Sequence, residues 1–280
     1  MMPLISVSEA LADIGEKNIV IVDARGGADA QARYASGHIE GAYFADLETD
    51  LSNKKQNAAD GGRHPLPDLK SFGAFLGKLG ITPSSEVIVY DDKGGANAAA
   101  RFWWMMKAIG HQGIYVIDGG LQAMITAGAV PVTTVPTFKN EKPYPTTAWQ
   151  SDIATMEEVA KAASDPSYLV IDVRENYRFR GESEPIDLVA GHIPGAVNIP
   201  YTTNLDADGS FLSADALATK YKDAIGNRKP EKVIVHCGSG VTACHTLLAL
   251  EEAEIEGAQL YVGSWSEWSR NNKPMATGDK

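Results

Sequence analysis

Short apolar runs, rich in valine and isoleucine, recur along the chain and alternate with longer stretches in which apolar and polar residues are mixed. Short runs bounded by turn residues are typical of the buried strands of a parallel sheet, and the amphipathic stretches between them are typical of helices. The pattern therefore predicts a series of βα units. The expected strands are residues 19–22, 87–90, 114–117, 169–171, 233–236 and 260–262.

Two further stretches have a clear pattern. Residues 98–109 contain the run Phe-Trp-Trp-Met-Met, and we expect a helix whose aromatic side chains lie in the core and do not bind a cofactor. Residues 129–149 contain four prolines. Because proline disrupts helices and central strands, this stretch is predicted to be an extended linker.

The sequence contains an internal repeat, which predicts two copies of one domain. The segment Ile19–Arg25 returns as Leu169–Arg174, with an Asp-x-Arg motif in each copy, and a Gly-His-Ile motif also occurs in both copies. Shared features are expected to be structural. The predicted organisation is a non-catalytic first domain (1–128), a linker (129–149) and a catalytic second domain (150–280), each domain of ordinary size.

Cys237 marks the point at which the two copies differ in chemistry. It follows an expected strand and opens the loop Cys-Gly-Ser-Gly-Val-Thr before a helix-compatible stretch, whereas the first copy has Asp91 at this place. Backbone N–H groups and the helix dipole there favour an anion and therefore a thiolate. We interpret Cys237 as a nucleophile; the alternative is a small core residue.

Four motifs together resemble those of the two-domain rhodanese-type sulfurtransferases. They are Asp118–Leu121, Gly191–Ala196, Cys237–Thr242 and Gly263–Trp268. The resemblance covers nearly the whole chain. It implies an α/β fold of two tandem rhodanese-like domains, each a parallel sheet flanked by helices, with an active site between the halves.

The resemblance also implies an activity. A small anionic donor, thiosulfate or 3-mercaptopyruvate, would pass its sulfur to Cys237, and the resulting persulfide would pass it to a thiol, cyanide or a protein acceptor. The reaction requires no metal and no organic cofactor. The loop residues Gly238, Ser239, Gly240, Val241 and Thr242 would surround the donor.

Further site residues are implied by the same resemblance. Arg180 matches an arginine that binds the donor's carboxylate or sulfonate, and Arg178 is the alternative. Mercaptopyruvate enzymes have a second arginine further along, but the segment Glu184–Asp187 contains none. The preferred donor is therefore left open between thiosulfate and 3-mercaptopyruvate.

From the first half, His64 resembles a histidine of a proton relay that also includes a carboxylate and the loop serine. Either Asp46 or Glu48 could supply that carboxylate. Asn97 is expected to reach the donor, since equivalent loops face each other in the family. An ordinary loop histidine is the alternative for His64.

Two other functions have different sequence requirements. A cysteine phosphatase or arsenate reductase would carry an arginine after five further loop residues, where this chain has Ala243. A non-catalytic rhodanese-like binding module would lack the cysteine, which the second copy retains. Cys244 is expected to be a small buried residue and not a resolving thiol.

Composition narrows the possible partners. The formal charge of −11 argues against nucleic acid and anionic membranes. The sequence has no run of eighteen apolar residues, no signal-peptide pattern and no metal-spaced Cys/His cluster. Two cysteines provide no disulfide framework, and a working thiolate suits a reducing compartment, so the cytoplasm is expected.

Overall fold

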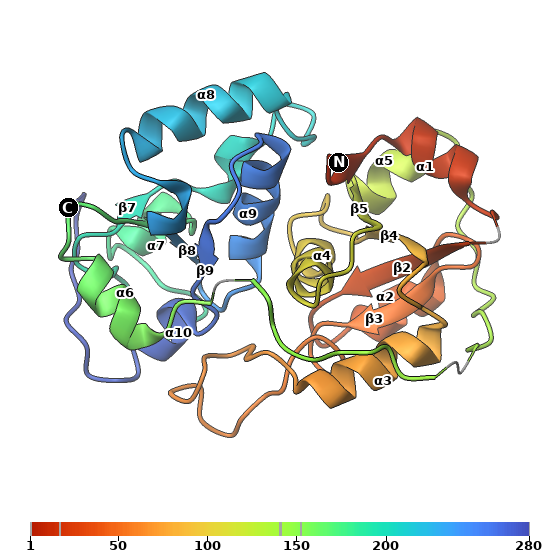
Figure 1. Cartoon of the computed structure of the whole chain (residues 1–280), viewed down its shortest axis with the longest axis horizontal. Helices are drawn as coiled ribbons and strands as arrows, with labels where there is room; N and C mark the ends of the chain where they lie inside the picture. Colours follow the sequence, from red (N-terminus) through yellow and green to blue (C-terminus); the bar gives the residue numbers. More distant parts are fainter. Residues whose placement is uncertain (1, 17, 140–141, 152, 280) are drawn as a thin grey trace. The chain divides into compact units, whose positions relative to one another are not determined.

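The computed structural model describes residues 2–16, 18–139, 142–151 and 153–279, and the chain divides into two compact units (Figure 1). The first unit comprises Met1–Asn53 and Leu66–Gln150. The second comprises Lys54–Pro65 and Ser151–Lys280. A segment of twelve residues from the first half of the sequence thus groups with the second half. Among the described residues, no helix is long and apolar enough to cross a membrane.

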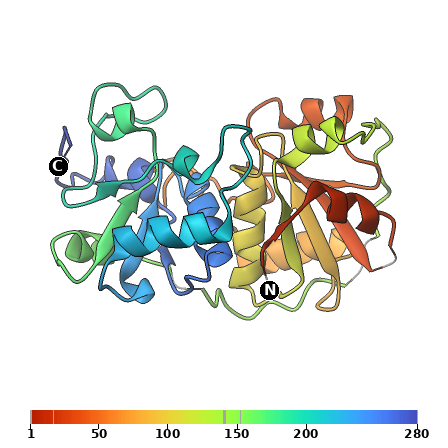
Figure 2. The same ribbon diagram turned by 90° about the horizontal axis from the view of Figure 1, so that it is seen from above.

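The first unit contains a five-stranded parallel sheet (Figure 2). Its strands are β1 (Leu4–Ile5), β2 (Ile19–Arg25), β3 (Tyr43–Asp46), β4 (Glu86–Tyr90) and β5 (Ile114–Ile117), in the order β1-β5-β4-β2-β3. Its helices are α1 (Val7–Asp13), α2 (Ala30–Ser36), α3 (Leu69–Leu79), α4 (Ala98–Ala108) and α5 (Gly120–Thr126). Figure 1 shows α1 and α5 on one side of the sheet and α3 on the other.

The second unit repeats this plan with a four-stranded parallel sheet. Its strands are β6 (Leu169–Asp172), β7 (Val197–Asn198), β8 (Val233–His236) and β9 (Gln259–Leu260), in the order β7-β6-β8-β9. Its helices are α6 (Met156–Ala162), α7 (Asn176–Phe179), α8 (Ala214–Ile225), α9 (Thr242–Glu252) and α10 (Ser264–Trp268), with short 3₁₀ turns at Tyr201–Asn204 and Pro230–Lys232. The predicted α/β fold with two parallel sheets is confirmed.

The buried cores explain where the apolar runs lie. In the second unit, Val159 of α6 and Trp265 of α10 pack with Val170 of β6 and Ile234 of β8, all nearly inaccessible to solvent. Burying each such side chain contributes about 1.5–3 kcal/mol. In the first unit, the aromatic run of α4 is buried throughout, so its predicted place in the core is confirmed.

The repeated Asp-x-Arg motif makes the same contacts in both units. The Arg25 guanidinium donates to Asp23 at 2.7 and 2.6 Å and also to a glycine carbonyl of the Gly-His-Ile motif. Arg174 donates to Asp172 at 2.6 Å and to the equivalent glycine carbonyl at 2.6 Å. All four side chains are buried, so each pair joins the end of a strand to the neighbouring loop.

The histidines of the repeated Gly-His-Ile motif are also structural. The His38 ring stacks on Tyr34 with ring centroids 4.0 Å apart, and its Nδ1 lies 2.9 Å from the Tyr34 carbonyl oxygen. His192 stacks on Phe179 at 3.7 Å, and its Nδ1 lies 2.8 Å from the Phe179 carbonyl oxygen. Both rings are fully buried.

The proline-rich stretch packs along the first unit wherever the structure describes it. The Tyr144 N–H donates to the Gly73 carbonyl oxygen of α3 at 2.9 Å. One turn further along α3, a Cβ on Gly77 would lie 2.5 Å from the Lys142 carbonyl oxygen, so glycine is required for this close approach. The predicted linker residues 140 and 141 lie outside the described residues.

Candidate active site

Cys237 occupies the carboxyl end of β8, at the start of the loop that leads into α9. Its side chain is buried, with 3% exposure for the whole residue. The Cys237 N–H donates to Ser264 Oγ at 3.1 Å, and the Trp265 N–H donates back to the Cys237 carbonyl oxygen at 3.0 Å. The Ser266 N–H donates to the Gly238 carbonyl oxygen at 2.9 Å. The beginning of α10 therefore fixes the backbone of the cysteine.

The loop itself depends on a glycine. Gly240 has a φ of +72°, in the left-handed region. A Cβ at this position would also lie 2.4 Å from the Val262 carbonyl oxygen. Both the conformation and the close packing exclude larger residues.

The backbone amides of this loop are available for an anion. The N–H groups of Gly238, Ser239, Val241 and Thr242 donate to no acceptor among the described residues. They lie directly before or at the start of α9, an eleven-residue helix whose N-terminus favours negative charge. Buried backbone donors are normally paired, so a run of open donors beside a cysteine is characteristic of an anion-binding loop.

In the first unit the equivalent loop is filled by its own side chain. The Asp91 carboxylate is completely buried and accepts four backbone N–H groups at 2.7–3.1 Å, those of Lys93, Gly95, Asn97 and Ala99. Burial raises the pKa of Asp91, and the four N–H donors only partly offset this effect. The Leu121 N–H donates to the Asp91 carbonyl oxygen at 2.9 Å, as Trp265 does to Cys237.

His64 reaches the cysteine loop on the segment Lys54–Pro65. This segment is attached to the second unit by hydrogen bonds from the Gly61 N–H to Glu267 at 3.0 Å and from Asn271 Nδ2 to the Ala59 carbonyl oxygen at 2.8 Å. His64 Nδ1 lies 2.8 Å from Ser239 Oγ, and both side chains are buried. The structure thus brings together two of the predicted residues that are far apart in the sequence.

The two candidate arginines lie in different surroundings. Arg178 is buried, and its Nη2 is 3.3 Å from the position that a Cβ on Gly238 would occupy. Arg180 has 41% side-chain exposure and pairs with Glu182 and Asp279 at 3.0 and 3.3 Å. Residues two apart in a helical turn point in nearly opposite directions, so α7 can direct only one of them to the loop. The structure brings Arg178 to the loop and does not bring Arg180 there.

Three charged residues beside the loop were not predicted. Arg63 Nη2 lies 2.9 Å from the same Cβ position on Gly238. The buried Asp187 carboxylate accepts from Arg63, Arg178 and Arg270. Glu184 accepts from Arg178 at 2.8–3.1 Å. Burial alone would raise the pKa of Glu184, but Arg178 and the N–H groups of Ile186 and Asp187 together lower it below its ordinary value. The only signal for this cluster in the sequence was that two acidic residues, Glu184 and Asp187, follow the arginine-rich stretch 174–180.

The remaining predicted residues are placed as follows. Asn97 lies in the first unit, where it precedes α4, and Asp46 and Glu48 also belong to that unit. Their contacts with a donor or with His64 stay predictions. Cys244 is fully buried in α9, and its Sγ lies 3.3 Å from the Gly240 carbonyl oxygen, which suits a packing role. No cluster of metal-ligating side chains occurs in the described parts of the chain.

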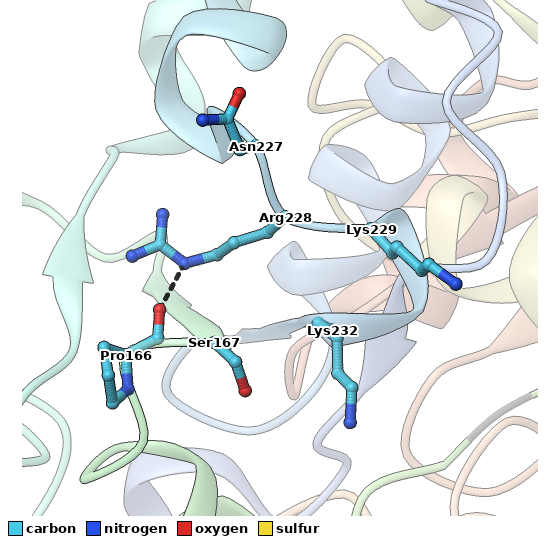
Figure 3. Close-up of a pocket in the computed structure, with 6 residues that line it drawn as sticks. All are labelled: Pro166, Ser167, Asn227, Arg228, Lys229 and Lys232. Atoms are coloured by element: carbon cyan, nitrogen blue, oxygen red, sulfur yellow. Dashed lines mark hydrogen bonds between the residues drawn. The ribbon is translucent and has the colours of Figure 1, made fainter.

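A pocket of about 540 Å³ lies elsewhere in the second unit (Figure 3). It is lined by residues that precede β6 and β8, at the amino-terminal ends of these strands, whereas Cys237 lies at the carboxyl end of β8. Figure 3 shows the side chains of Arg228 and Lys229 pointing in opposite directions, so these cations do not converge on one point. The cysteine loop, and not this pocket, is therefore the candidate active site of the second unit.

Known proteins of one family are similar to this chain in sequence and in fold. The model of the rhodanese-like domain matches residues 6–127 and 155–271. A probable 3-mercaptopyruvate sulfurtransferase from Pseudomonas aeruginosa is 38% identical over 99% of this chain and 98% of its own length. A putative thiosulfate sulfurtransferase, SseB from Mycobacterium tuberculosis, is 38% identical over 89% of this chain and 87% of its own. The crystal structure of SseA from Escherichia coli, 30% identical, superimposes with a TM-score of 0.76 over 95% of this chain and all of that one.

The fold is that of tandem rhodanese-like domains, and the chain belongs to the rhodanese family. Within it, the protein is a sulfurtransferase of the group that contains the 3-mercaptopyruvate and thiosulfate enzymes. The two relatives at 38% identity carry different donors in their names.

Proposed function

We propose that the protein moves a sulfane sulfur from thiosulfate or 3-mercaptopyruvate to a thiol, cyanide or protein acceptor through a persulfide on Cys237. The observation that carries this proposal is the buried cysteine beside four backbone N–H groups, those of Gly238, Ser239, Val241 and Thr242, for which the described residues provide no acceptor. A terminal persulfide sulfur is an anion, and these donors can stabilise it without rearrangement.

In the first half-reaction, the Cys237 thiolate attacks the outer sulfur of the donor, and a new S–S bond forms. With thiosulfate, the old S–S bond breaks and its electron pair leaves with sulfite. With 3-mercaptopyruvate, the C–S bond breaks and the pair leaves as the enolate of pyruvate, which must then gain a proton. In the second half-reaction, the acceptor attacks the outer sulfur and releases the Cys237 thiolate.

The pair of Ser239 and His64 supplies the proton that only the 3-mercaptopyruvate reaction requires. The 2.8 Å separation between Ser239 Oγ and His64 Nδ1 permits proton transfer between the two side chains. The donor's anionic group is proposed to lie near Arg178 and not near Arg180, because Arg178, unlike Arg180, lies against the loop.

The experiment is intact-mass measurement of the protein after treatment with each donor, followed by peptide mapping. The proposal predicts a gain of one sulfur, about 32 Da, on Cys237, and its loss on adding a dithiol or cyanide. A sulfur found on Cys244, or none with either donor, would contradict it. Steady-state rates with both donors then decide between them.

A further inference from the structure

His236, the last residue of β8, directly precedes Cys237, and its imidazole ring is completely buried. Its Nδ1 lies 3.3 Å from the Cys237 carbonyl oxygen. The same oxygen accepts from the Trp265 N–H at 3.0 Å. Because a carbonyl oxygen can only accept, the imidazole contact requires a hydrogen on Nδ1. Two donors, one from a side chain and one from α10, therefore hold this carbonyl group in one direction.

The direction of this carbonyl group determines the direction of the next amide. The peptide bond between Cys237 and Gly238 is planar and trans, so its C=O and N–H point in opposite directions. The Gly238 N–H is one of the four loop donors without an acceptor among the described residues. A hydrogen bond to the carbonyl oxygen also polarises the peptide group and strengthens its N–H as a donor. His236 can therefore act on the anion-binding loop through one peptide group.

The other nitrogen of the ring lies near a buried carboxylate. His236 Nε2 is 3.8 Å from Asp172 Oδ2 and makes no hydrogen bond among the described residues. The other charged or titratable side chains around the ring are Arg174, His192 and Tyr261. Burial lowers the pKa of His236, and the opposing effect of Asp172 is smaller. The ring is therefore neutral near pH 7 and carries one hydrogen, which the contact with the carbonyl oxygen places on Nδ1.

The first unit has a different side chain at this position. Tyr90 pairs with Asp23 in the register of β2 and β4. In the same way, His236 pairs with Asp172 in the register of β6 and β8. The Tyr90 hydroxyl accepts from the Ile39 N–H at 2.9 Å and so bonds to the Gly-His-Ile motif. An imidazole thus precedes the loop that is open to an anion, and a tyrosine precedes the loop that its own carboxylate fills.

We propose that His236 is a positioning residue whose Nδ1–H fixes and polarises the peptide group between Cys237 and Gly238, and thereby stabilises an anionic sulfur at the loop. This role rests on the Cys237 nucleophile of the proposed function, but its effect on the thiolate does not require sulfur transfer. A hydrogen bond that strengthens a donor to the anionic form favours that form over the neutral thiol. Loss of the Nδ1 donor should therefore raise the pH at which the thiolate forms.

The first test measures the rate of Cys237 alkylation by iodoacetamide across the pH range in which a cysteine ionises, with peptide mapping to identify the modified residue. Iodoacetamide is neutral, so the rate follows the thiolate fraction. His236→Tyr introduces the residue of the first unit and should move the midpoint of the pH profile upward by about one unit. His236→Asn keeps an N–H₂ group as far along the side chain as Nδ1 and should restore most of the wild-type profile.

The matched control is His245→Gln, which alters another fully buried histidine of the same unit and should leave the profile unchanged. Equal shifts in His236→Tyr and His236→Asn would indicate that the ring only fills space, and a profile unchanged in both would equally overturn the proposal. Nitrogen NMR shifts of the wild-type His236 ring give a measurement that needs no variant. They should show the hydrogen on Nδ1; a hydrogen on Nε2 would exclude the proposed contact.

The second test measures persulfide formation from thiosulfate or 3-mercaptopyruvate by rapid quench. His236→Tyr should slow this step roughly three- to tenfold near pH 7 and approach the wild-type rate at higher pH, where the thiolate is fully formed. A loss that persists at high pH would indicate damage to the structure of the loop and contradict the proposed role. If the wild type forms no persulfide, the proposed function fails, and the alkylation profiles still decide whether His236 acts on Cys237.

Discussion

The two halves of the molecule place a loop between equivalent elements, residues 91–97 between β4 and α4 and residues 237–241 between β8 and α9, and fill it differently. In the first unit, four backbone N–H groups converge on the carboxylate of Asp91. In the second unit, the N–H groups of Gly238, Ser239, Val241 and Thr242 donate to no acceptor in the described part of the chain. In both, an N–H of the helix after the next strand, that of Leu121 in α5 or of Trp265 in α10, donates to the carbonyl oxygen of this first loop residue. The anion-binding loop is therefore a property of the scaffold, and the residue at its start determines whether an anion from outside can enter.

The comparison also separates structural from chemical residues. The Asp-x-Arg pairs and the stacked histidines occur in both units with nearly identical contacts. By contrast, Arg63 and Asp187 pair beside the cysteine loop, whereas in the first unit Arg33 pairs with Asp92 of the loop itself. A feature found in one unit only is the better candidate for function.

The largest expected effect is that of Cys237→Ser, which should abolish persulfide formation. An alcohol is a poor nucleophile toward sulfur and forms no stable persulfide. Mass measurement after donor treatment checks this. The matched control is Cys244→Ala, which should still gain about 32 Da on Cys237. Residual turnover in Cys237→Ser would place the nucleophile elsewhere.

His64→Gln should lower turnover of 3-mercaptopyruvate by about a hundredfold or more, because proton supply to the enolate is lost. Persulfide formation from thiosulfate, whose leaving group needs no proton, should change much less. Ser239→Ala should behave similarly, and the double variant should show little further loss. Rapid-quench kinetics with each donor measure this split; an equal loss with both donors would indicate a structural role for His64.

Asp91→Ala should destabilise the protein by about 3 kcal/mol, because four N–H groups lose a buried acceptor and are only partly rehydrated. Cys237→Ala should cost less than about 1 kcal/mol, since no such bonds are lost. Urea unfolding measures both. Formate or acetate should stabilise Asp91→Ala more than wild type by entering the emptied loop. Equal stability of the two variants would mean that the first loop is not held by its carboxylate.

The smallest effect concerns acid stability of the second unit. Burial lowers the pKa of His245 in α9 from 6.5 to about 3, with a smaller contribution from Lys220. Below pH 6.5 the unfolded chain takes up a proton that the folded histidine does not, so stability falls as pH falls toward 3. At pH 5 the loss is about 2 kcal/mol.

Urea unfolding at pH 7 and pH 5 tests this. His245→Gln should lose about 2 kcal/mol less than wild type between these pH values, whatever its stability at pH 7. An identical pH dependence in the two proteins would show that His245 is not the group responsible.

Local patterns predicted the larger elements and the loop. A valine-rich run followed by a glycine-containing loop is visible in the sequence. It predicted a strand over residues 233–236, which is β8, with Cys237 directly after it. The short edge strands β1, β3 and β7 carry no long apolar run, and β9 ends at Leu260, earlier than the pattern predicted. Edge strands pair on one side only and need little apolar surface.

Long-range contacts could not be predicted in the same way. Arg63 and Asp187 are 124 residues apart, and no periodicity relates them. Which of Arg178 and Arg180 lies against the loop depends on the side of one short helical turn that faces it. The two arginines are only two residues apart, and a sequence motif alone does not distinguish them. The inclusion of Lys54–Pro65 in the second unit is likewise visible only in three dimensions.

The position of that segment has a consequence for synthesis of the protein on the ribosome. His64 precedes Ser239 by 175 residues, and Ala59 precedes Asn271 by 212. Protein synthesis proceeds at about 5–20 residues per second, so roughly 10–40 s pass between synthesis of this segment and synthesis of the residues that it binds. The first half can fold during this interval, but Arg63 and His64 have no loop to join. The candidate active site is therefore assembled last, after the cysteine loop and α10 have been synthesised.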